Sequence, residues 1–165
     1  MLRLRPLRRE DEAAFRAGHD QAAEEGVIFG LRFEPGMSWD GYLRLLTDQR
    51  AGLKLPDGHV PSTFLAAEAA GELVGRVSIR HELNDVLRRY GGHVGYVVLP
   101  AHRRRGHGTE ILRQSLVIAR SLGIDQVLVT CDGDNAGSIA VIESCGGVRH
   151  EVAAAEPRTR YYWIA

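Results

Sequence analysis

Apolar and polar residues alternate along several short stretches of this chain, and a period of two is typical of half-buried β-strands. Elsewhere apolar residues recur every three or four positions, which predicts amphipathic helices. The predicted strands cover residues 2–7, 63–68, 73–81, 93–99, 127–131, 148–153 and 160–165. The predicted helices cover residues 10–25, 39–50, 110–122 and 138–144, with a helical turn or loop over 82–92. This order of elements predicts a mixed α/β fold.

Turn and capping residues support several of these boundaries. Ser38 is placed to cap the helix over 39–50, and Gly123 is placed to end the helix over 110–122. Residues 70–72 join two of the strands, which predicts an antiparallel hairpin.

The composition is that of a globular protein. The chain has 165 residues, of which 44% are hydrophobic and 25% charged, enough for a sizeable core. Because 21 basic residues balance 21 acidic ones, neither nucleic acid nor an anionic membrane is an expected partner. We find no signal peptide and no membrane-spanning stretch, and Cys131 and Cys145 suggest no disulfide framework. We therefore expect a single domain over residues 1–165, located in the cytoplasm.

The most informative segment is 97–109, where an apolar strand runs into a basic turn with two glycines and then into a helix. Backbone N–H groups at a helix N-terminus bind anions, and residues 103–105 add three positive charges. Gly106 and Gly108 leave room for a phosphate close to the backbone. The spacing fits neither a Rossmann fingerprint nor a P-loop. A diphosphate-bearing cofactor is the natural ligand, and a plain strand-to-helix turn with a solvated basic cluster is the alternative.

The pattern Arg103-x-x-Gly106-x-Gly108 resembles the acyl-CoA-binding motif of the GNAT superfamily of N-acetyltransferases. Residues 2–12 are similar to the first strand and helix start of that family. Asn135-x-x-Ser138, followed by a glycine pair at 146–147, resembles its second cofactor-contacting block. The resemblance implies a mixed, mostly antiparallel central sheet flanked by helices, in which the central strand splays away from its neighbour.

The same resemblance implies acetyl-CoA as co-substrate, held along the splayed strand. The backbone of Val97, Val98 and Leu99 would hold the pantetheine arm and the thioester carbonyl. Asn135 would bind the arm beside Ser138, although Asn135 can equally cap the helix that follows, and the two roles are compatible. The cofactor-binding turn would consist of Arg103, Arg104, Arg105, Gly106, His107, Gly108 and Thr109, with the amides of residues 104–109 around the pyrophosphate.

The implied reaction is direct attack of a primary amine on the thioester, which requires a base or a water chain to take the amine proton. Three residues near the predicted central strand are candidates for this chemistry, Glu82, His93 and Tyr96. An ordinary histidine pKa suits base catalysis near neutral pH. Glu82 can act as a base or anchor a cationic substrate, or it can simply cap the following turn. Residues three apart on a strand face opposite ways, so His93 and Tyr96 share a face only if a bulge intervenes.

One position departs from the family pattern. The family usually has a tyrosine seven residues after the motif asparagine, and this chain has Ile142. Cys145, Tyr161 and Tyr162 are alternative proton donors, although ordinary core packing accounts for each of them. The missing tyrosine keeps a second function open, a non-catalytic acyl-CoA sensor or regulatory module on the same fold.

The acceptor is expected to be a small-molecule amine or a peptide amine. By resemblance, acceptor selectivity lies in segments 26–38 and 82–92. Homodimers are common in the family, so a homodimer stays open. We expect no metal, because His102 and His107 lack the spacing of metal ligands and the two cysteines do not form a Cys-x-x-Cys pair.

Overall fold

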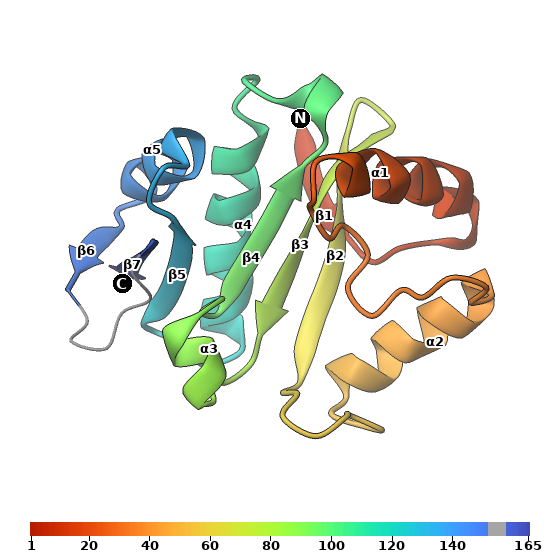
Figure 1. Cartoon of the computed structure of the whole chain (residues 1–165), viewed down its shortest axis with the longest axis horizontal. Coiled ribbons are helices and arrows are strands. Elements are labelled where there is room, and N and C mark those ends of the chain that lie inside the picture. The colour runs from red at the N-terminus through yellow and green to blue at the C-terminus, as the bar shows by residue number, and fades with distance from the viewer. Residues whose placement is uncertain (152–157) are drawn as a thin grey trace.

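The computed structural model describes residues 1–151 and 158–165, and its strands form two sheets (Figure 1). The larger sheet has the order β1-β2-β3-β4 and the smaller one the order β5-β7-β6. The strands are β1 (Leu2–Arg5), β2 (Ser62–Ala69), β3 (Glu72–Arg80), β4 (Val94–Val98), β5 (Val127–Asp132), β6 (Val148–His150) and β7 (Thr159–Ile164). Every strand pair recorded among the described residues is antiparallel.

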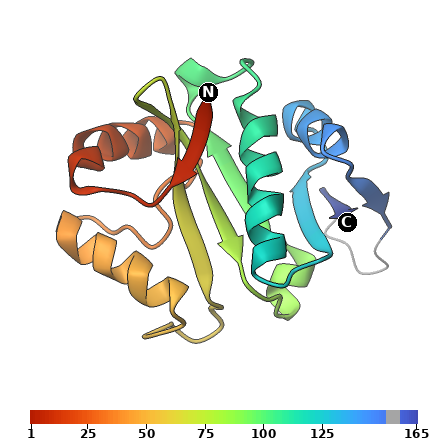
Figure 2. The same ribbon diagram turned by 180° about the vertical axis from the view of Figure 1, so that it is seen from behind.

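Helices cover both faces of the larger sheet. The helices are α1 (Glu12–Glu24), α2 (Trp39–Arg50), α3 (Asp85–Arg89), α4 (His107–Ser121) and α5 (Ala136–Ser144), with 3-10 turns at Arg9–Asp11 and Pro100–His102. α1 and α2 lie on one face, and α4 crosses the opposite face (Figures 1 and 2). α5 lies above β5 and β7, beside the start of α4.

Two apolar clusters hold these layers together. Beneath α1 and α2, the aromatic rings of Phe15, Phe29 and Tyr42 are fully buried, and the Phe15 ring contacts the other two. Beneath α4, Ile111 and Leu112 are fully buried against both sheets. The second cluster therefore joins the larger sheet to the smaller one.

The predicted mixed α/β class is confirmed, and most boundaries lie within two residues of their predicted positions. Ser38 caps α2 as predicted, accepting from Gly41 N–H. The hairpin between β2 and β3 turns at Ala70 and Gly71, both with positive φ. The largest difference is α4, which begins three residues before the predicted start, so that Gly108 lies in its first turn.

The sixth predicted strand is described only in part. The strand expected over 148–153 is observed as β6, Val148–His150, and residues 152–153 lie outside the described part. Among the described residues, no helix has the length and apolar character needed to cross a bilayer.

Candidate active site

β4 and β5 start close together beside α3 and diverge toward α5 and the start of α4 (Figure 1). They belong to different sheets, and among the described residues β4 pairs only with β3. Leu99 N–H donates to Val74 O of the β3 segment at 2.9 Å. Because backbone groups alternate in direction along a strand, those of Tyr96 and Val98 point away from β3. The backbone groups of Tyr96 and the N–H of Val98 therefore face the space between the sheets, whereas Val98 O accepts from Arg103 Nε.

A cavity of about 770 Å³ opens at this place. Eleven of the residues predicted from the sequence line it, namely Tyr96, Val97, Val98, Arg103, Arg104, Gly106, His107, Gly108, Thr109, Asn135 and Ser138. The lining also contains Glu25, Val27, His102, Gly137 and Val141, which the sequence pattern did not single out as site residues. Four predicted site residues, Glu82, His93, Leu99 and Arg105, are not part of the lining.

The start of α4 forms the end of the cavity at which the sequence predicts an anion. Gly106 is the N-cap with φ 77°, a left-handed conformation that suits glycine. The N–H of Glu110 donates to Gly106 O at 3.1 Å, so the amides of the three residues between them have no earlier carbonyl to bind in the helix. A Cβ added at Gly108 would lie 3.3 Å from Val141 Cγ2 and 3.5 Å from the Tyr96 ring. The glycine therefore keeps this end open.

The arginines of the turn differ in what they contact. Arg103 Nε donates to Val98 O at 3.1 Å, and its Nη2 lies 2.6 Å from Glu25 Oε2. Arg103 thus joins the end of β4 to the end of α1 across one side of the cavity. Arg104 lines the cavity with φ 59°, whereas Arg105 is exposed outside it. The prediction that all three contact the cofactor stays a prediction.

Asn135 combines a structural contact with a place in the cavity wall. Its Oδ1 accepts from Ser138 N–H at 2.9 Å and so caps α5. The capping role is therefore confirmed. Contact with a cofactor arm stays a prediction, which the position of both residues in the lining favours.

Tyr96 carries a buried hydroxyl with no hydrogen-bond partner among the described residues. Burial raises its pKa to about 12, and the nearby Ser138 side chain opposes that rise. The phenol is therefore protonated at neutral pH. Buried polar groups are normally paired, so this orphan hydroxyl, on a residue that lines the cavity beside Ser138, is the polar group to test there.

The other two catalytic candidates lie elsewhere. His93 comes before the first residue of β4, and its Nδ1 accepts from Leu128 N–H at 2.9 Å. Burial, with the charges of Arg88 and Arg80, lowers its pKa to about 4. Glu82 follows β3 outside the cavity lining. The alternative role of Glu82 as a helix cap is wrong, because the cap of α3 is Asn84, which accepts from Leu87 N–H.

The alternative proton donors are engaged in packing. Ile142 is fully buried in the core beneath α4. Tyr162 donates to Glu143 at 3.1 Å and Tyr161 donates to Arg89 O, and neither lines the cavity. Cys145 donates weakly to Thr109 O at 3.7 Å, and burial raises its pKa.

A buried arginine fixes the segment expected to select the acceptor. Arg76 of β3 donates to Ile28 O at 2.6 Å, Phe29 O at 3.0 Å and Gly95 O at 2.9 Å. These three bonds bind the loop after α1 to the middle of β4. This loop belongs to the predicted acceptor segment 26–38, and its Val27 lines the same cavity as Tyr96.

Across the described ranges, no three His, Cys, Asp or Glu side chains come together in a group suited to a metal ion.

The fold and the cavity together define a class of protein, an α/β protein whose split sheet opens beside an anion-binding helix N-terminus. A family model described as an acetyltransferase (GNAT) domain matches residues 1–148. The chain therefore belongs to the GNAT acetyltransferase family.

Solved structures with the same fold agree with this assignment. RimJ from Mycobacterium smegmatis, in complex with CoA-disulfide, is 21% identical to this chain and superposes with a TM-score of 0.68. The match covers 99% of this chain and 81% of that chain. An acetyltransferase from Agrobacterium tumefaciens is 21% identical, with a TM-score of 0.67 and coverage of 99% and 90%. Spermidine N-acetyltransferase from Vibrio cholerae, in complex with CoA and spermine, is 20% identical, with a TM-score of 0.62 and coverage of 99% and 94%. No curated protein matches the sequence.

Proposed function

We propose that this protein transfers an acetyl group from acetyl-CoA to a primary amine by direct attack within a ternary complex. The observation that carries the proposal is the cavity between the diverging strands, with an anion-binding turn at one end and the orphan Tyr96 hydroxyl in its wall. Both features match the needs of a long co-substrate with a diphosphate and a thioester. The CoA complexes of the two structural neighbours support the same co-substrate.

The residues present fit this co-substrate. Acetyl-CoA supplies an activated acetyl thioester when bound. The amides at the start of α4 and the side chain of Arg104 bind the diphosphate, and Gly108 keeps that space free of side-chain atoms. The outward-facing backbone of Tyr96 and the N–H of Val98 bind the pantetheine arm in the manner of an added strand, next to the Val98 carbonyl that Arg103 holds. A main-chain N–H of β4 is the natural donor to the developing oxyanion.

Tyr96 acts as the proton donor, a role that the isoleucine at position 142 cannot perform. Its hydroxyl holds a proton at neutral pH, and the residue lines the cavity, where a thiolate leaving group needs a proton. The ring of His93 is engaged with Leu128, and Glu82 lies outside the cavity lining, so Glu82 can act as the base only through water. A cytoplasmic location and a homodimer stay predictions.

The Tyr96→Phe variant tests the proton-donor role. Because general acid catalysis contributes about 10²-fold or more, kcat is expected to fall by about that factor while the Kd for CoA stays within about threefold. The variant keeps the ring that packs beside Gly108 and removes only the oxygen. Steady-state kinetics and calorimetry on the same samples measure the two effects, and Tyr90→Phe on the exposed surface is the matched control. An unchanged kcat for Tyr96→Phe would remove Tyr96 from the mechanism.

Thiol release from acetyl-CoA with a panel of amines tests the transfer reaction itself. The panel contains polyamines, amino acids and peptides with free N-termini, and turnover with any of them supports an acetyltransferase. Tight binding of CoA without thiol release for every amine would favour the sensor, for which the missing family tyrosine is the one supporting feature. Absence of CoA binding would overturn both functions.

A further inference from the structure

One residue joins the two sheets at the closed end of the gap between β4 and β5. The N–H of His93 donates to Leu128 O at 2.7 Å, and Leu128 N–H donates to His93 Nδ1 at 2.9 Å. Both backbone groups of Leu128 are therefore bound by the same histidine. β5 pairs with β7 from Val127 onward, and from Val94 onward β4 pairs with β3, so the gap between β4 and β5 opens beyond this contact.

Further hydrogen bonds hold the two glycines before His93 in place. Arg80 Nη1 donates to Gly91 O at 2.9 Å and to Gly92 O at 3.3 Å, and Gly91 N–H donates to Thr130 Oγ1 at 3.0 Å. Gly92 has φ 59°, and a Cβ at this position would collide with Leu128 O. The segment before β4 is thus held from β3 and β5 at once.

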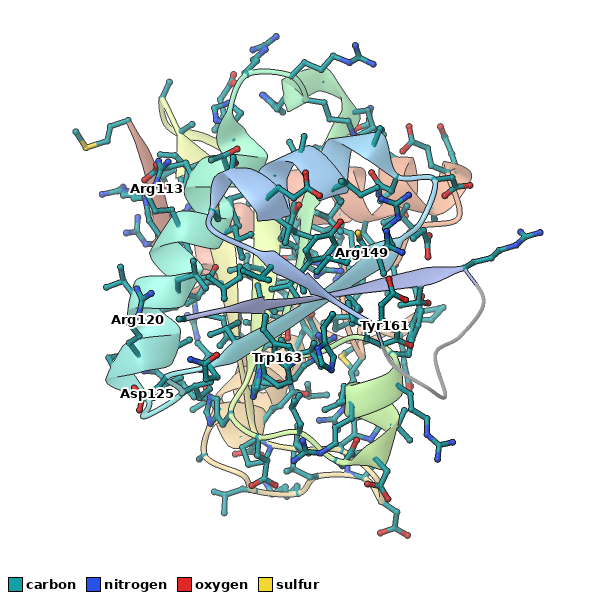
Figure 3. The ribbon with its side chains drawn as sticks, turned by 90° about the vertical axis from the view of Figure 1, so that its left-hand side faces the viewer. Arg113, Arg120, Asp125, Arg149, Tyr161 and Trp163 are labelled. Atoms are coloured by element: carbon teal, nitrogen blue, oxygen red, sulfur yellow. The ribbon has the colours of Figure 1, made fainter. Side chains whose placement is uncertain are left out.

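The imidazole itself is fixed on its remaining side. His93 is 8% exposed, and Trp163 of β7, labelled in Figure 3, lies with its ring centroid 6.4 Å away in an edge-on arrangement. Because Nδ1 accepts a hydrogen bond, the neutral ring carries its proton on Nε2. Neither nitrogen is then free to accept a proton from an amine. The positive charges of Arg80 on β3 and Arg88 on α3 oppose protonation of the ring.

We propose that His93 is a positioning residue, which fixes the closed end of the gap and thereby the width of the cofactor cavity. The inference rests on the proposed function, because it assigns the cavity to acetyl-CoA. Tyr96 and Val98 lie three and five residues further along the strand, so a change at His93 displaces the wall that holds the cofactor. Displacements near 1 Å at such walls cost as much as about 10²-fold in rate.

Two substitutions separate positioning from base catalysis. In His93→Asn, the side-chain oxygen can replace Nδ1 as the acceptor for Leu128 N–H, but the amide cannot act as a base. In His93→Leu, the acceptor is lost and Leu128 N–H stays buried without a partner. Calorimetry with CoA, kinetics with acetyl-CoA and thermal melting are measured on both variants and on the wild type.

The expected result is rescue by asparagine. His93→Leu raises both the Kd for CoA and the KM for acetyl-CoA by about tenfold or more, whereas His93→Asn keeps them, and kcat, within about threefold of the wild type. A base would give the opposite pattern, with kcat reduced by about 10²-fold or more in both variants and an unchanged Kd. Equal CoA binding by the wild type and His93→Leu would also overturn the inference. Failure of the wild type to bind CoA would instead overturn the proposed function.

Nitrogen NMR of the histidine rings gives a test that needs no variant. The His93 ring is expected to show a bare Nδ1 and a protonated Nε2, unchanged between pH 7.5 and 5.5. A proton on Nδ1, or titration of this ring near its ordinary pKa of about 6.5, would contradict the arrangement. This measurement tests whether His93 is engaged with Leu128 or available as a base even if His93→Leu does not fold.

Discussion

Replacing Gly108 with tryptophan is expected to abolish CoA binding, with a Kd raised by about 100-fold or more. The first side-chain atom at this position would already lie 3.3 Å from Val141 and 3.5 Å from the Tyr96 ring, so the indole must extend into the cavity. It would occupy the space beside the helix amides that the diphosphate needs. Calorimetric titration with CoA and with acetyl-CoA measures the loss.

A matched substitution controls for the effect of an added indole on the helix. Val117 lies on α4 with 63% of its surface exposed, far along the helix from the cavity-lining turn. Val117→Trp is expected to bind CoA like the wild type. Tryptophan has a higher helix propensity than glycine, so Gly108→Trp does not weaken α4 through its backbone. A Gly108→Trp variant that melts normally and still binds CoA would show that the cofactor lies elsewhere.

Local sequence patterns are sufficient to predict most of the helices and strands and the basic turn over residues 103–109. The two strand segments that became β2 and β3, with a glycine turn between them, predict a hairpin because both strands and their turn are neighbours in sequence. The segment 103–109 could also be recognised locally, because its arginines, its glycines and the helix start are neighbours in sequence. The start of α4 was placed too late because glycine is a poor helix former. In the structure, Gly106 caps the helix and Gly108 sits in the first turn, where backbone amides need no helical partner.

Contacts between distant segments were beyond the reach of such patterns. Glu25 and Val27 reach the cavity from the end of α1, and no local motif marks them. His93 was a reasonable base by residue type, but its partner Leu128 lies 35 residues further along the chain. A histidine engaged by a backbone N–H and one facing a substrate have the same sequence signature. Only the packing of the two sheets distinguishes them.

The N-terminal strand shows the same limit and leads to a second large effect. Alternation predicted β1 correctly, but its basic residues were not assigned partners. Arg5 binds Asp11 through two hydrogen bonds, of 2.6 Å and 2.8 Å, and binds Glu68 of β2 at 2.6 Å. Asp11 is 7% exposed and also accepts from Arg8 N–H at 2.7 Å. This ion pair joins the first strand to the turn that starts α1.

Asp11→Asn is expected to lower the free energy of unfolding by about 2 to 3 kcal/mol at pH 7. This is somewhat less than the cost of breaking an isolated buried pair, because Arg5 is still paired with Glu68 in the variant. The Arg5 guanidinium holds the pKa of Asp11 below its ordinary value. A carboxylate with a depressed folded pKa stabilises the protein above the unfolded pKa of about 3.9 and loses that effect as the pH falls below it. The difference between wild type and variant is therefore expected to shrink between pH 5 and pH 3.

Urea unfolding at pH 7, 5, 4 and 3 measures this difference, and Glu68 contributes to both proteins alike. Asp40→Asn is the matched control, because Asp40 pairs with Arg9 at 3.3 Å on the surface, where the two side chains are 51% and 81% exposed. Exposed pairs contribute about 0 to 1 kcal/mol, so this variant is expected to change stability little at any pH. Equal effects of the two substitutions, or a difference for Asp11→Asn that does not depend on pH, would contradict a stabilising role for the buried pair. A loss confined to Asp11→Asn would establish that Arg5 and Asp11 fix the first strand to the helix beside the cofactor cavity.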